Sequence, residues 1–212
     1  MAQTVISDMS NSELRGAEAT VEPCVFMGRR AIVKMRPAKG YRIPELDQRI
    51  RSTRTRSEAR LTREARMAGV RTPCIYDVDL RECSITMERM EGPTVKQYLD
   101  SNPTDPEGIC PKVGRCIALM HNAGICHGDL TTSNMIVTDG EVSLIDFSMG
   151  SSRVTLEEIG VDVRLLERAF TSAHPGMESL FGALMDSYYS TVDEPEKVRK
   201  KVEDIRNRGR YT

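Results

Sequence analysis

Residues 127–147 hold two aspartates and one asparagine at a spacing that is typical of phosphoryl-transfer sites. Asn134 follows Asp129 by five residues, and Asp146 follows Asn134 by twelve. Asp129 can orient an attacking hydroxyl or water, or accept its proton. Asn134 offers a neutral amide oxygen to a hard cation, and Asp146 offers a full negative charge to the same cation. This motif constrains the fold most, because its three side chains must converge on one Mg²⁺-dependent centre.

Apolar residues on both sides of the motif predict two short strands. Residues 135–137 follow the asparagine and residues 142–145 precede the second aspartate, with Asp139-Gly140 as a hairpin turn between them. The metal ligands then lie at one end of a β-ribbon. Any one of these polar residues, taken alone, is more simply explained as a turn cap. The whole run, with His127-Gly128 ahead of it, favours a catalytic site.

The composition favours a cytoplasmic protein with one large or two small domains. The 212 residues include no run of 18 apolar residues, so no membrane span is expected. Residues 1–12 are polar, lack the pattern of a signal peptide and are expected to form a flexible leader. The six cysteines form no C-x-x-C pair, which favours buried thiols in a reducing compartment over structural zinc or disulfides.

The near-neutral net charge of −1 conceals two basic blocks. Residues 36–71 contain eleven Lys/Arg against four Asp/Glu, and residues 197–210 contain seven against two. Two such blocks on an otherwise acidic chain indicate an anionic partner surface, for which nucleic acid is one candidate. For either block alone, a solvated helix face is an equally good interpretation.

The N-terminal part is predicted to form a hairpin followed by a long helix. Residues 20–26 and 30–35 alternate as antiparallel strands, and Lys34 ends the second of them. Residues 46–68 have apolar positions at helical spacing, and Gly69 is a plausible stop. Glu58 lies on the apolar face of this helix, which indicates a cationic partner, and Lys34 is the natural candidate. A solvated Glu58, or Glu64 as the partner of Lys34, are the alternatives.

Strands are expected at residues 75–80 and 84–88, before a break at Gly92-Pro93 that indicates a hinge. The remaining chain is mainly helical by its periodicity. Its expected helices lie near residues 94–100, 107–122, 155–173, 176–191 and 194–206.

The order of these features resembles a protein kinase, and the finer match is to one family. The quoted motifs are Gly-Ala-Glu-Ala at 16–19, Lys39-Gly-Tyr41-Arg42, His-Gly-Asp-Leu-Thr-Thr-Ser-Asn at 127–134, Val161-Asp162 with Glu167-Arg168-Ala169, and the terminal Arg-x-Arg-Gly-Arg. Over residues 13–210 the chain resembles the small atypical kinase/ATPase subunit of the KEOPS complex, which supports threonylcarbamoyl-adenosine modification of tRNA. The fold class that the resemblance implies is α+β, a minimal bilobal protein-kinase-like fold. A β-rich N-lobe with one long helix would span residues 13–90, a helical C-lobe 91–205 and a basic tail 206–212.

The resemblance also implies roles for individual residues. Asp129 matches the catalytic-loop aspartate, Asn134 and Asp146 match the metal ligands, and Asp162 matches an aspartate that braces the catalytic loop. Lys34 matches the phosphate-binding lysine, with Glu58 as its ion-pair partner. The implied adenine site and phosphate cover comprise Met87 as gatekeeper, the backbone of Glu88 and Met90, and Gly16, Ala17, Glu18 and Ala19. The implied contacts to a partner transferase and tRNA are Arg206, Arg208 and Arg210.

Three departures from ordinary protein kinases bear on activity. Residues 16–19 have too few glycines for the usual phosphate-covering loop. Ser148 replaces the glycine of the Asp-Phe-Gly motif, and serine has less access to positive φ. Gly128 stands where regulated kinases place arginine, and no Ala-Pro-Glu segment follows. These departures weigh against protein kinase activity more than against ATP binding.

The expected function is therefore ATP- and Mg²⁺-dependent phosphoryl transfer, with Mn²⁺ as an alternative metal. The chain would act mainly as an ATPase switch, with atypical Ser/Thr kinase activity, beside a threonylcarbamoyltransferase subunit, a small accessory subunit and tRNA. One alternative is a small-molecule phosphotransferase, because His-Gly-Asp followed by Asn also occurs in aminoglycoside-type kinases. A non-catalytic nucleotide-binding adaptor is the other alternative.

Overall fold

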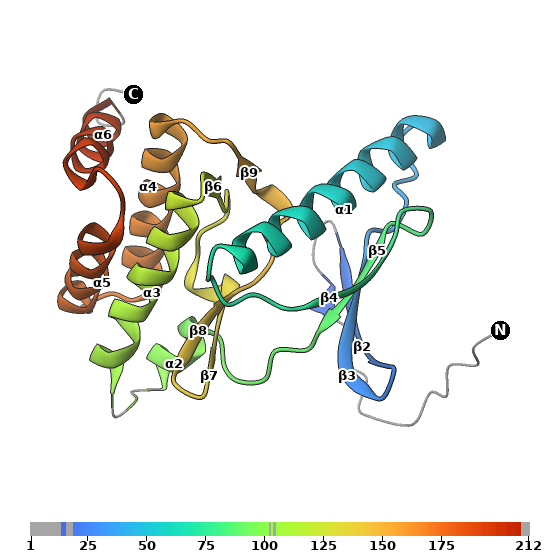
Figure 1. Ribbon diagram of the computed structural model, residues 1–212, viewed down its shortest axis with the longest axis horizontal. Coiled ribbons are helices and arrows are strands. Elements are labelled where there is room, and N and C mark those ends of the chain that lie inside the picture. Colours follow the sequence, from blue (N-terminus) through green and yellow to red (C-terminus); the bar gives the residue numbers. More distant parts are fainter. Residues whose placement is uncertain (1–13, 16–18, 102, 104, 209–212) are drawn as a thin grey trace. The chain divides into compact units, whose positions relative to one another are not determined.

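The computed structural model describes residues 14–15, 19–101, 103 and 105–208 (Figure 1). The expectations for Gly16, Ala17, Glu18 and Arg210, and for the leader up to residue 12, fall outside the described residues. The chain divides into two compact units. The first comprises Met1–Ala59 with Cys74–Arg89, and the second comprises Arg60–Pro73 with Met90–Thr212.

The first unit is built on an antiparallel sheet of five strands in the order β1-β2-β3-β5-β4. The strands are β1 Leu14–Arg15, β2 Thr20–Phe26, β3 Arg29–Met35, β4 Ile75–Asp79 and β5 Ser84–Glu88. The predicted hairpin is confirmed, and its turn places Met27 and Gly28 at φ 48° and 78°. Two successive positive φ values give the turn the twist that a β-hairpin needs, and glycine reaches them without strain.

The predicted long helix is α1, Pro44–Met67. Pro44 is its first residue. The carboxylates of Glu45 and Asp47 in the first turn stabilise the helix by interacting with the positive end of its dipole. The helix ends before Gly69, which has φ 90°. Its residues up to Ala59 belong to the first unit, and its last two turns belong to the second.

The second unit is mainly helical, as predicted, and its helices lie close to the expected ranges. They are α2 Val95–Asp100, α3 Pro106–Asn122, α4 Leu156–Ala173, α5 Glu178–Thr191 and α6 Pro195–Arg208. Helix α3 lies beside α5 (Figure 1), and Gly114 permits this because a Cβ there would lie 2.0 Å from the Leu184 carbonyl oxygen. The core around α3 includes Ile117, Met120, Leu184 and Tyr188, all almost fully buried.

Two short ribbons carry the loops of the motif. Strand β7, Met135–Thr138, pairs with β8, Glu141–Leu144, through a turn at Asp139 and Gly140, as predicted. Strand β6, Ile125–Cys126, pairs with β9, Ser151–Ser152. Two 3₁₀ turns complete the segment, η1 at Thr132–Asn134 and η2 at Phe147–Met149.

The six cysteines are free thiols, and four of them are buried. These four are Cys83, Cys110, Cys116 and Cys126. Burial raises the pKa of Cys110 to about 11 and that of Cys116 to about 12. The expectation of buried thiols is confirmed for these four, whereas Cys24 and Cys74 are half-buried. None of the helices in the described part of the chain is long and apolar enough to cross a membrane.

Candidate active site

A carboxylate on α4 holds the start of the loop that carries Asp129 and Asn134, which is called the catalytic loop below. Asp162 is 1% exposed, and its Oδ2 accepts a hydrogen bond of 2.7 Å from the backbone N–H of His127. Its Oδ1 accepts one of 2.9 Å from the N–H of Gly128. The predicted brace is therefore present. It fixes the two residues that directly precede Asp129.

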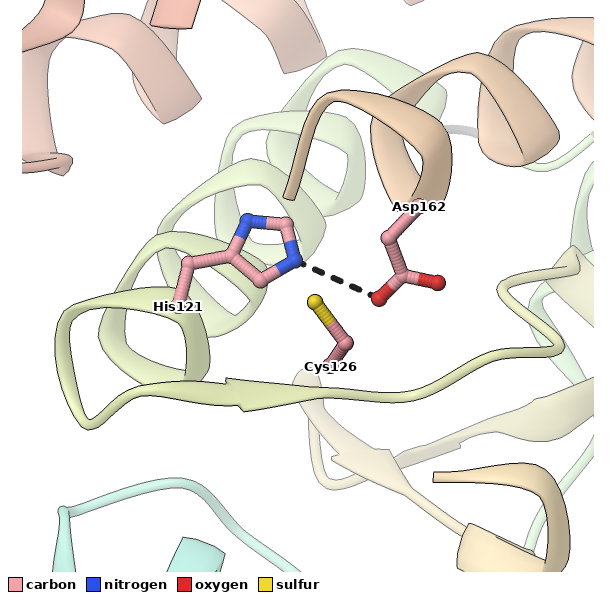
Figure 2. Close-up of side chains that lie close together, drawn as sticks. All are labelled: His121, Cys126 and Asp162. Carbon is pink, nitrogen blue, oxygen red and sulfur yellow. Dashed lines mark hydrogen bonds and ion pairs between the residues drawn. The ribbon is translucent and has the colours of Figure 1, made fainter. Parts of the chain in front are cut away.

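Asp162 also belongs to a buried polar cluster (Figure 2). Its Oδ2 lies 3.3 Å from Nε2 of His121, whose Nδ1 lies 2.8 Å from the Tyr188 hydroxyl. The Sγ of Cys126 lies within 4.8 Å of the ligand atoms of His121 and Asp162, so the three could be taken for a metal site. Hydrogen bonds already engage both carboxylate oxygens and both imidazole nitrogens. Burial also raises the pKa of the Cys126 thiol, which keeps it protonated. We therefore interpret this cluster as the support of the catalytic loop.

Hydrogen bonds to Ile145 connect the catalytic loop to the loop that carries Asp146, which is called the metal loop below. The Nε2 of His127 lies 2.9 Å from the Ile145 carbonyl oxygen, so this nitrogen carries the proton and donates. The Ile145 N–H donates to the Asn134 carbonyl oxygen at 3.0 Å. Both backbone groups of Ile145 are thus bound by the catalytic loop. Asp146, the residue after Ile145, is therefore held beside the catalytic loop.

Asp129 and Asn134 are in direct contact. The Asn134 Nδ2 donates to Asp129 Oδ2 at 2.8 Å and to the Asp129 carbonyl oxygen at 2.9 Å. These bonds use the amide nitrogen, which leaves Oδ1 as the oxygen that can bind a cation. They also set the direction of the exposed Asp129 carboxylate. The structure therefore brings together the first two residues of the motif, as the spacing required.

Asp146 adopts a left-handed backbone conformation, with φ 65° and ψ 67°. Its side chain accepts a hydrogen bond of 3.2 Å from the Ser148 N–H. The positive φ therefore falls on the aspartate, while Ser148 lies in a 3₁₀ turn and is not among the described residues with positive φ. For this reason serine fits at the position where ordinary protein kinases have glycine.

Gly128 is required by a close approach between the two loops. Its φ is 76°, and a Cβ at this position would lie 2.2 Å from the Met149 carbonyl oxygen. Neither the backbone conformation nor the space admits a side chain. The glycine that replaces the kinase arginine therefore lets the metal loop pack directly on the catalytic loop.

The first unit contains the predicted pair of Lys34 and Glu58. Lys34 Nζ lies 2.7 Å from Glu58 Oε1, and the two residues are 6% and 2% exposed. The prediction is confirmed, and Glu64 instead binds Arg60 at 3.0 Å. Glu58 has a second partner that was not predicted, because Arg36 Nη2 binds its Oε2. Strand alternation could have indicated this contact, because Arg36 follows Lys34 by two residues and side chains two apart point to the same face of a sheet.

The implied adenine-site residues are divided between the units. Met87 is 7% exposed in β5, and the Glu88 N–H donates to the Cys74 carbonyl oxygen at 2.8 Å. That amide is therefore engaged within the sheet. Met90 belongs to the second unit, and Ala19 directly precedes β2. The role of all four residues in nucleotide binding stays a prediction.

Two arginines of the predicted basic tail lie within a helix. Arg206 and Arg208 lie in the last turn of α6, where a tail from residue 206 had been predicted. Arg206 Nη2 binds Glu167 Oε1 at 2.9 Å, and Arg208 Nη2 binds Glu157 Oε1 at 2.5 Å. The hydrogen bond from Arg208 is the main cause that lowers the pKa of Glu157. These ion pairs across α4 and α6 extend the helix, and the role of the two arginines toward a partner stays a prediction.

A histidine that the sequence did not single out also supports the catalytic loop. His174 caps α4, is 3% exposed and lies with Nε2 2.9 Å from the Thr132 hydroxyl in η1. Burial lowers its pKa, and Asp100, whose Oδ1 is 3.6 Å from Nδ1, acts in the opposite direction. The two ends of the loop are thus both held by α4. Residues this far apart in sequence give no local pattern.

Comparison with known proteins identifies the family of this chain. Residues 39–188 match the model of the lipopolysaccharide kinase (Kdo/WaaP) family. The KEOPS complex subunit Bud32 of Pyrococcus abyssi is 42% identical over 186 residues, which cover 86% of this chain and 84% of that protein. The chain belongs to the Bud32 family. The EKC/KEOPS complex subunit bud32 of Dictyostelium discoideum is 37% identical over 92% of this chain and 81% of its own length. The resemblance found in the sequence is confirmed.

Other relatives of this Bud32-family chain are longer. A probable bifunctional tRNA threonylcarbamoyladenosine biosynthesis protein of Methanothermobacter thermautotrophicus is 40% identical over 93% of this chain but only 36% of that protein. The chain thus spans about a third of the length of such relatives. Among solved structures, WaaP in complex with acyl carrier protein matches with a TM-score of 0.57 and 15% identity, covering 92% of this chain and 88% of WaaP. This likeness concerns the fold and confirms the predicted kinase-like class.

Proposed function

We propose that the chain catalyses Mg²⁺-dependent phosphoryl transfer from ATP, mainly as an ATPase and also as an atypical Ser/Thr protein kinase. The observation that carries the proposal is the Asp162 carboxylate, which holds the amides of His127 and Gly128 directly before Asp129. A loop fixed in this way presents a carboxylate at a constant position, and positioning is most of what phosphoryl transfer requires of a protein.

The donor atoms fit Mg²⁺ rather than a softer metal. Asn134 offers an amide oxygen and Asp146 a carboxylate, and hard divalent cations prefer such ligands with phosphate oxygens and water. The bound cation would neutralise charge on the phosphates. Asp129 would orient the attacking hydroxyl or water. Lys34, held by Glu58 at 2.7 Å, would bind phosphate oxygens.

The short connection after Asp146 favours water over a peptide as the main acceptor. Only η2, β9 and a few further residues separate Asp146 from α4, which begins at Leu156. In regulated kinases this segment is a longer activation loop, which becomes ordered on phosphorylation and helps to bind a peptide substrate. This favours ATP hydrolysis as the principal activity, with phosphorylation of Ser/Thr as the minor one.

We also propose that the chain works in the cytoplasm within a KEOPS complex. Its partners there would be a threonylcarbamoyltransferase subunit and a small accessory subunit, with tRNA as the substrate of the assembly. Support comes from relatives, two of which are named KEOPS subunits and others bifunctional tRNA threonylcarbamoyladenosine biosynthesis proteins.

The test is a γ-labelled ATP assay with Mg²⁺, in which free phosphate and protein-bound phosphate are counted separately. The protein is assayed alone and with a threonylcarbamoyltransferase and tRNA, beside the Asp129→Asn and Asp146→Asn variants. We expect phosphate release that rises with the partner and is lost in both variants. Label that accumulates mainly on protein would make the kinase activity the principal one. Tight nucleotide binding without any transfer would leave only the adaptor interpretation.

A further inference from the structure

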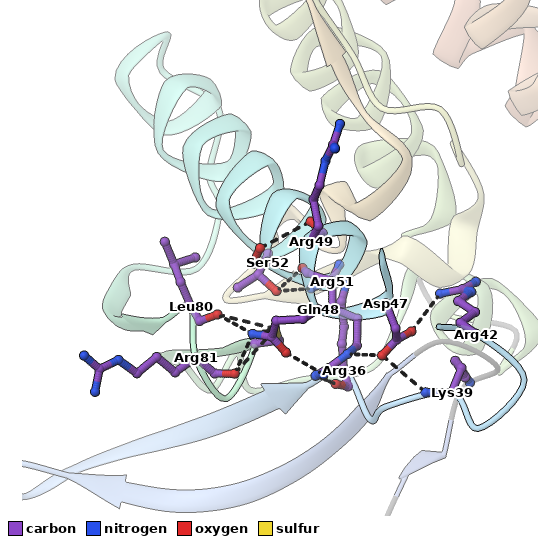
Figure 3. Close-up of polar contacts among 12 residues, drawn as sticks. Arg36, Lys39, Arg42, Asp47, Gln48, Arg49, Arg51, Ser52, Leu80 and Arg81 are labelled. Carbon is purple, nitrogen blue, oxygen red and sulfur yellow. Dashed lines mark hydrogen bonds and ion pairs between the residues drawn. The ribbon is translucent and has the colours of Figure 1, made fainter. Parts of the chain in front are cut away.

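The first unit contains a pocket whose charged lining side chains are all cationic. Pro37 and Ile50 complete its wall. The cationic lining residues are Arg36, Lys39, Arg42, Arg51 and Arg54. They come from the segment after β3 and from the first three turns of α1. Figure 3 labels Arg36, Lys39, Arg42 and Arg51. The basic block in the sequence is thus partly folded into a concave site, which a merely solvated helix face would not produce.

A single buried carboxylate gathers several of these residues. Asp47 is 2% exposed and accepts hydrogen bonds from Arg51 Nε at 2.7 Å, Arg42 Nη1 at 3.3 Å and the Lys39 N–H at 3.4 Å (Figure 3). Burial would raise the pKa of Asp47, but these bonds outweigh it, so the pKa is lowered. Asp47 therefore stays ionised and holds the Arg42 and Arg51 guanidinium groups in place.

Arg36 provides a buried donor that lines the same pocket. It is 3% exposed, and its Nη groups bind Glu58 and, at 3.4 Å, the Thr55 hydroxyl. Its Nε is buried and has no hydrogen-bond partner in the described part of the chain. A buried N–H without an acceptor is unfavourable, and the charge of an anion in the pocket would offset part of that cost.

The size of the pocket limits how much of an anion can enter it. Its volume of about 10 Å³ has room for one water or one ligand oxygen. A phosphodiester can insert one non-bridging oxygen while its two ester links stay outside. Beside the pocket, Tyr41 is 78% exposed, with the Arg42 guanidinium 5.2 Å from its ring centroid. An exposed aromatic ring next to cations is the arrangement on which nucleic-acid bases stack.

We propose that this basic pocket, lined by Arg36, Lys39, Arg42, Arg51 and Arg54, binds a phosphodiester group of an RNA backbone. Tyr41 stacks on a neighbouring base. The contact is to the backbone, so it positions the RNA without reading its sequence. This inference rests on the proposed function only for the choice of tRNA as the RNA.

The test measures binding of fluorescently labelled tRNA to the full chain by anisotropy between 50 and 200 mM NaCl, about the range over which phosphate contacts dominate the salt response. The test variants are Lys39→Gln, Arg54→Gln and Tyr41→Ala. Arg56→Gln is the matched control, because Arg56 is an exposed arginine of α1 that does not line the pocket. Thermal melting confirms that each variant is folded.

We expect Lys39→Gln and Arg54→Gln each to weaken tRNA binding by about 3- to 10-fold and to lower the slope of log K against log salt by about 0.7 to 1. Tyr41→Ala should weaken binding with the salt slope unchanged, because stacking releases no counterions. Arg56→Gln should change affinity by less than about 2-fold. Equal losses in Arg54→Gln and Arg56→Gln would overturn the proposal, since the pocket would then have no special role.

Competitors identify the source of the anion. Single-stranded RNA should displace tRNA, whereas inorganic phosphate and poly-glutamate at equal charge should not. Displacement by poly-glutamate that is lost in Arg54→Gln would show that the pocket takes an acidic protein segment, and would overturn the RNA assignment. ATP turnover of the wild type is measured separately. Its absence would refute the proposed function and leave the binding result intact.

Discussion

Replacing Asp162 by asparagine tests the brace of the catalytic loop. The carboxylate accepts one hydrogen bond from each of two backbone N–H groups, at 2.7 and 2.9 Å. An asparagine can accept from one of them with its oxygen, but its NH₂ group then faces the other donor. One charge-assisted bond is lost and the second is weakened, each worth about 1.5–3 kcal/mol. We expect the free energy of unfolding to fall by about 2–4 kcal/mol.

The same substitution should reduce ATP turnover in protein that is still folded. The amides of His127 and Gly128 fix the position of Asp129, and a misplacement of about 1 Å costs up to about 100-fold in rate. We expect kcat to fall by about 10- to 100-fold with a smaller change in KM. Urea unfolding gives the stability, and steady-state ADP release at 10 °C gives kcat. The matched control is Asp186→Asn, an exposed aspartate of α5. An Asp162→Asn protein with wild-type stability and kcat would refute the brace.

Three further predictions concern other contacts. Lys34→Ala should lower kcat/KM for ATP by about 100-fold while the fold persists, because Glu58 retains a second cation; full activity would remove Lys34 from the nucleotide site. Gly128→Ala should lose about 2–3 kcal/mol in urea unfolding and most activity, because its Cβ meets the Met149 carbonyl; a wild-type melting curve would contradict this. The lowered pKa of His174 means that the unfolded chain takes up a proton first as pH falls below about 6.5, so stability should decline from there downward. The His174→Gln variant should show a smaller decline between pH 7.5 and 5.5, and an equal decline would exclude this histidine as the cause.

Local patterns in the sequence predicted the helices and the longer strands, whereas the two-residue strands β1, β6 and β9 were not predicted. The helices lie close to the ranges that the periodicity predicted, and the Asp139-Gly140 turn has the residues that its positive φ values demand. The pairing of Lys34 with Glu58 followed from a carboxylate on an apolar helix face. These features could be predicted because each depends on residues within one element or on one motif.

Apart from the Lys34–Glu58 pair and the Asp162 brace, contacts between distant segments could not be predicted in this way. No local pattern indicated that Arg36 shares Glu58 with Lys34, or that His174 contacts Thr132. The end of α6 was also misjudged, because Arg206 and Arg208 are held by glutamates of another helix and local propensity alone would let that end fray. In each case tertiary contacts decide the conformation.

The free cysteines divide the chain into regions with different chemical reactivity. Only thiolates that the reagent can reach are alkylated, so a buried thiol reacts when its surroundings open. Cys83 lies in the first unit, whereas Cys110 and Cys116 lie in the core of the second. Mass spectrometry of alkylated protein can therefore time the opening of each unit separately. The half-buried Cys24 and Cys74 can be alkylated while the protein is still folded.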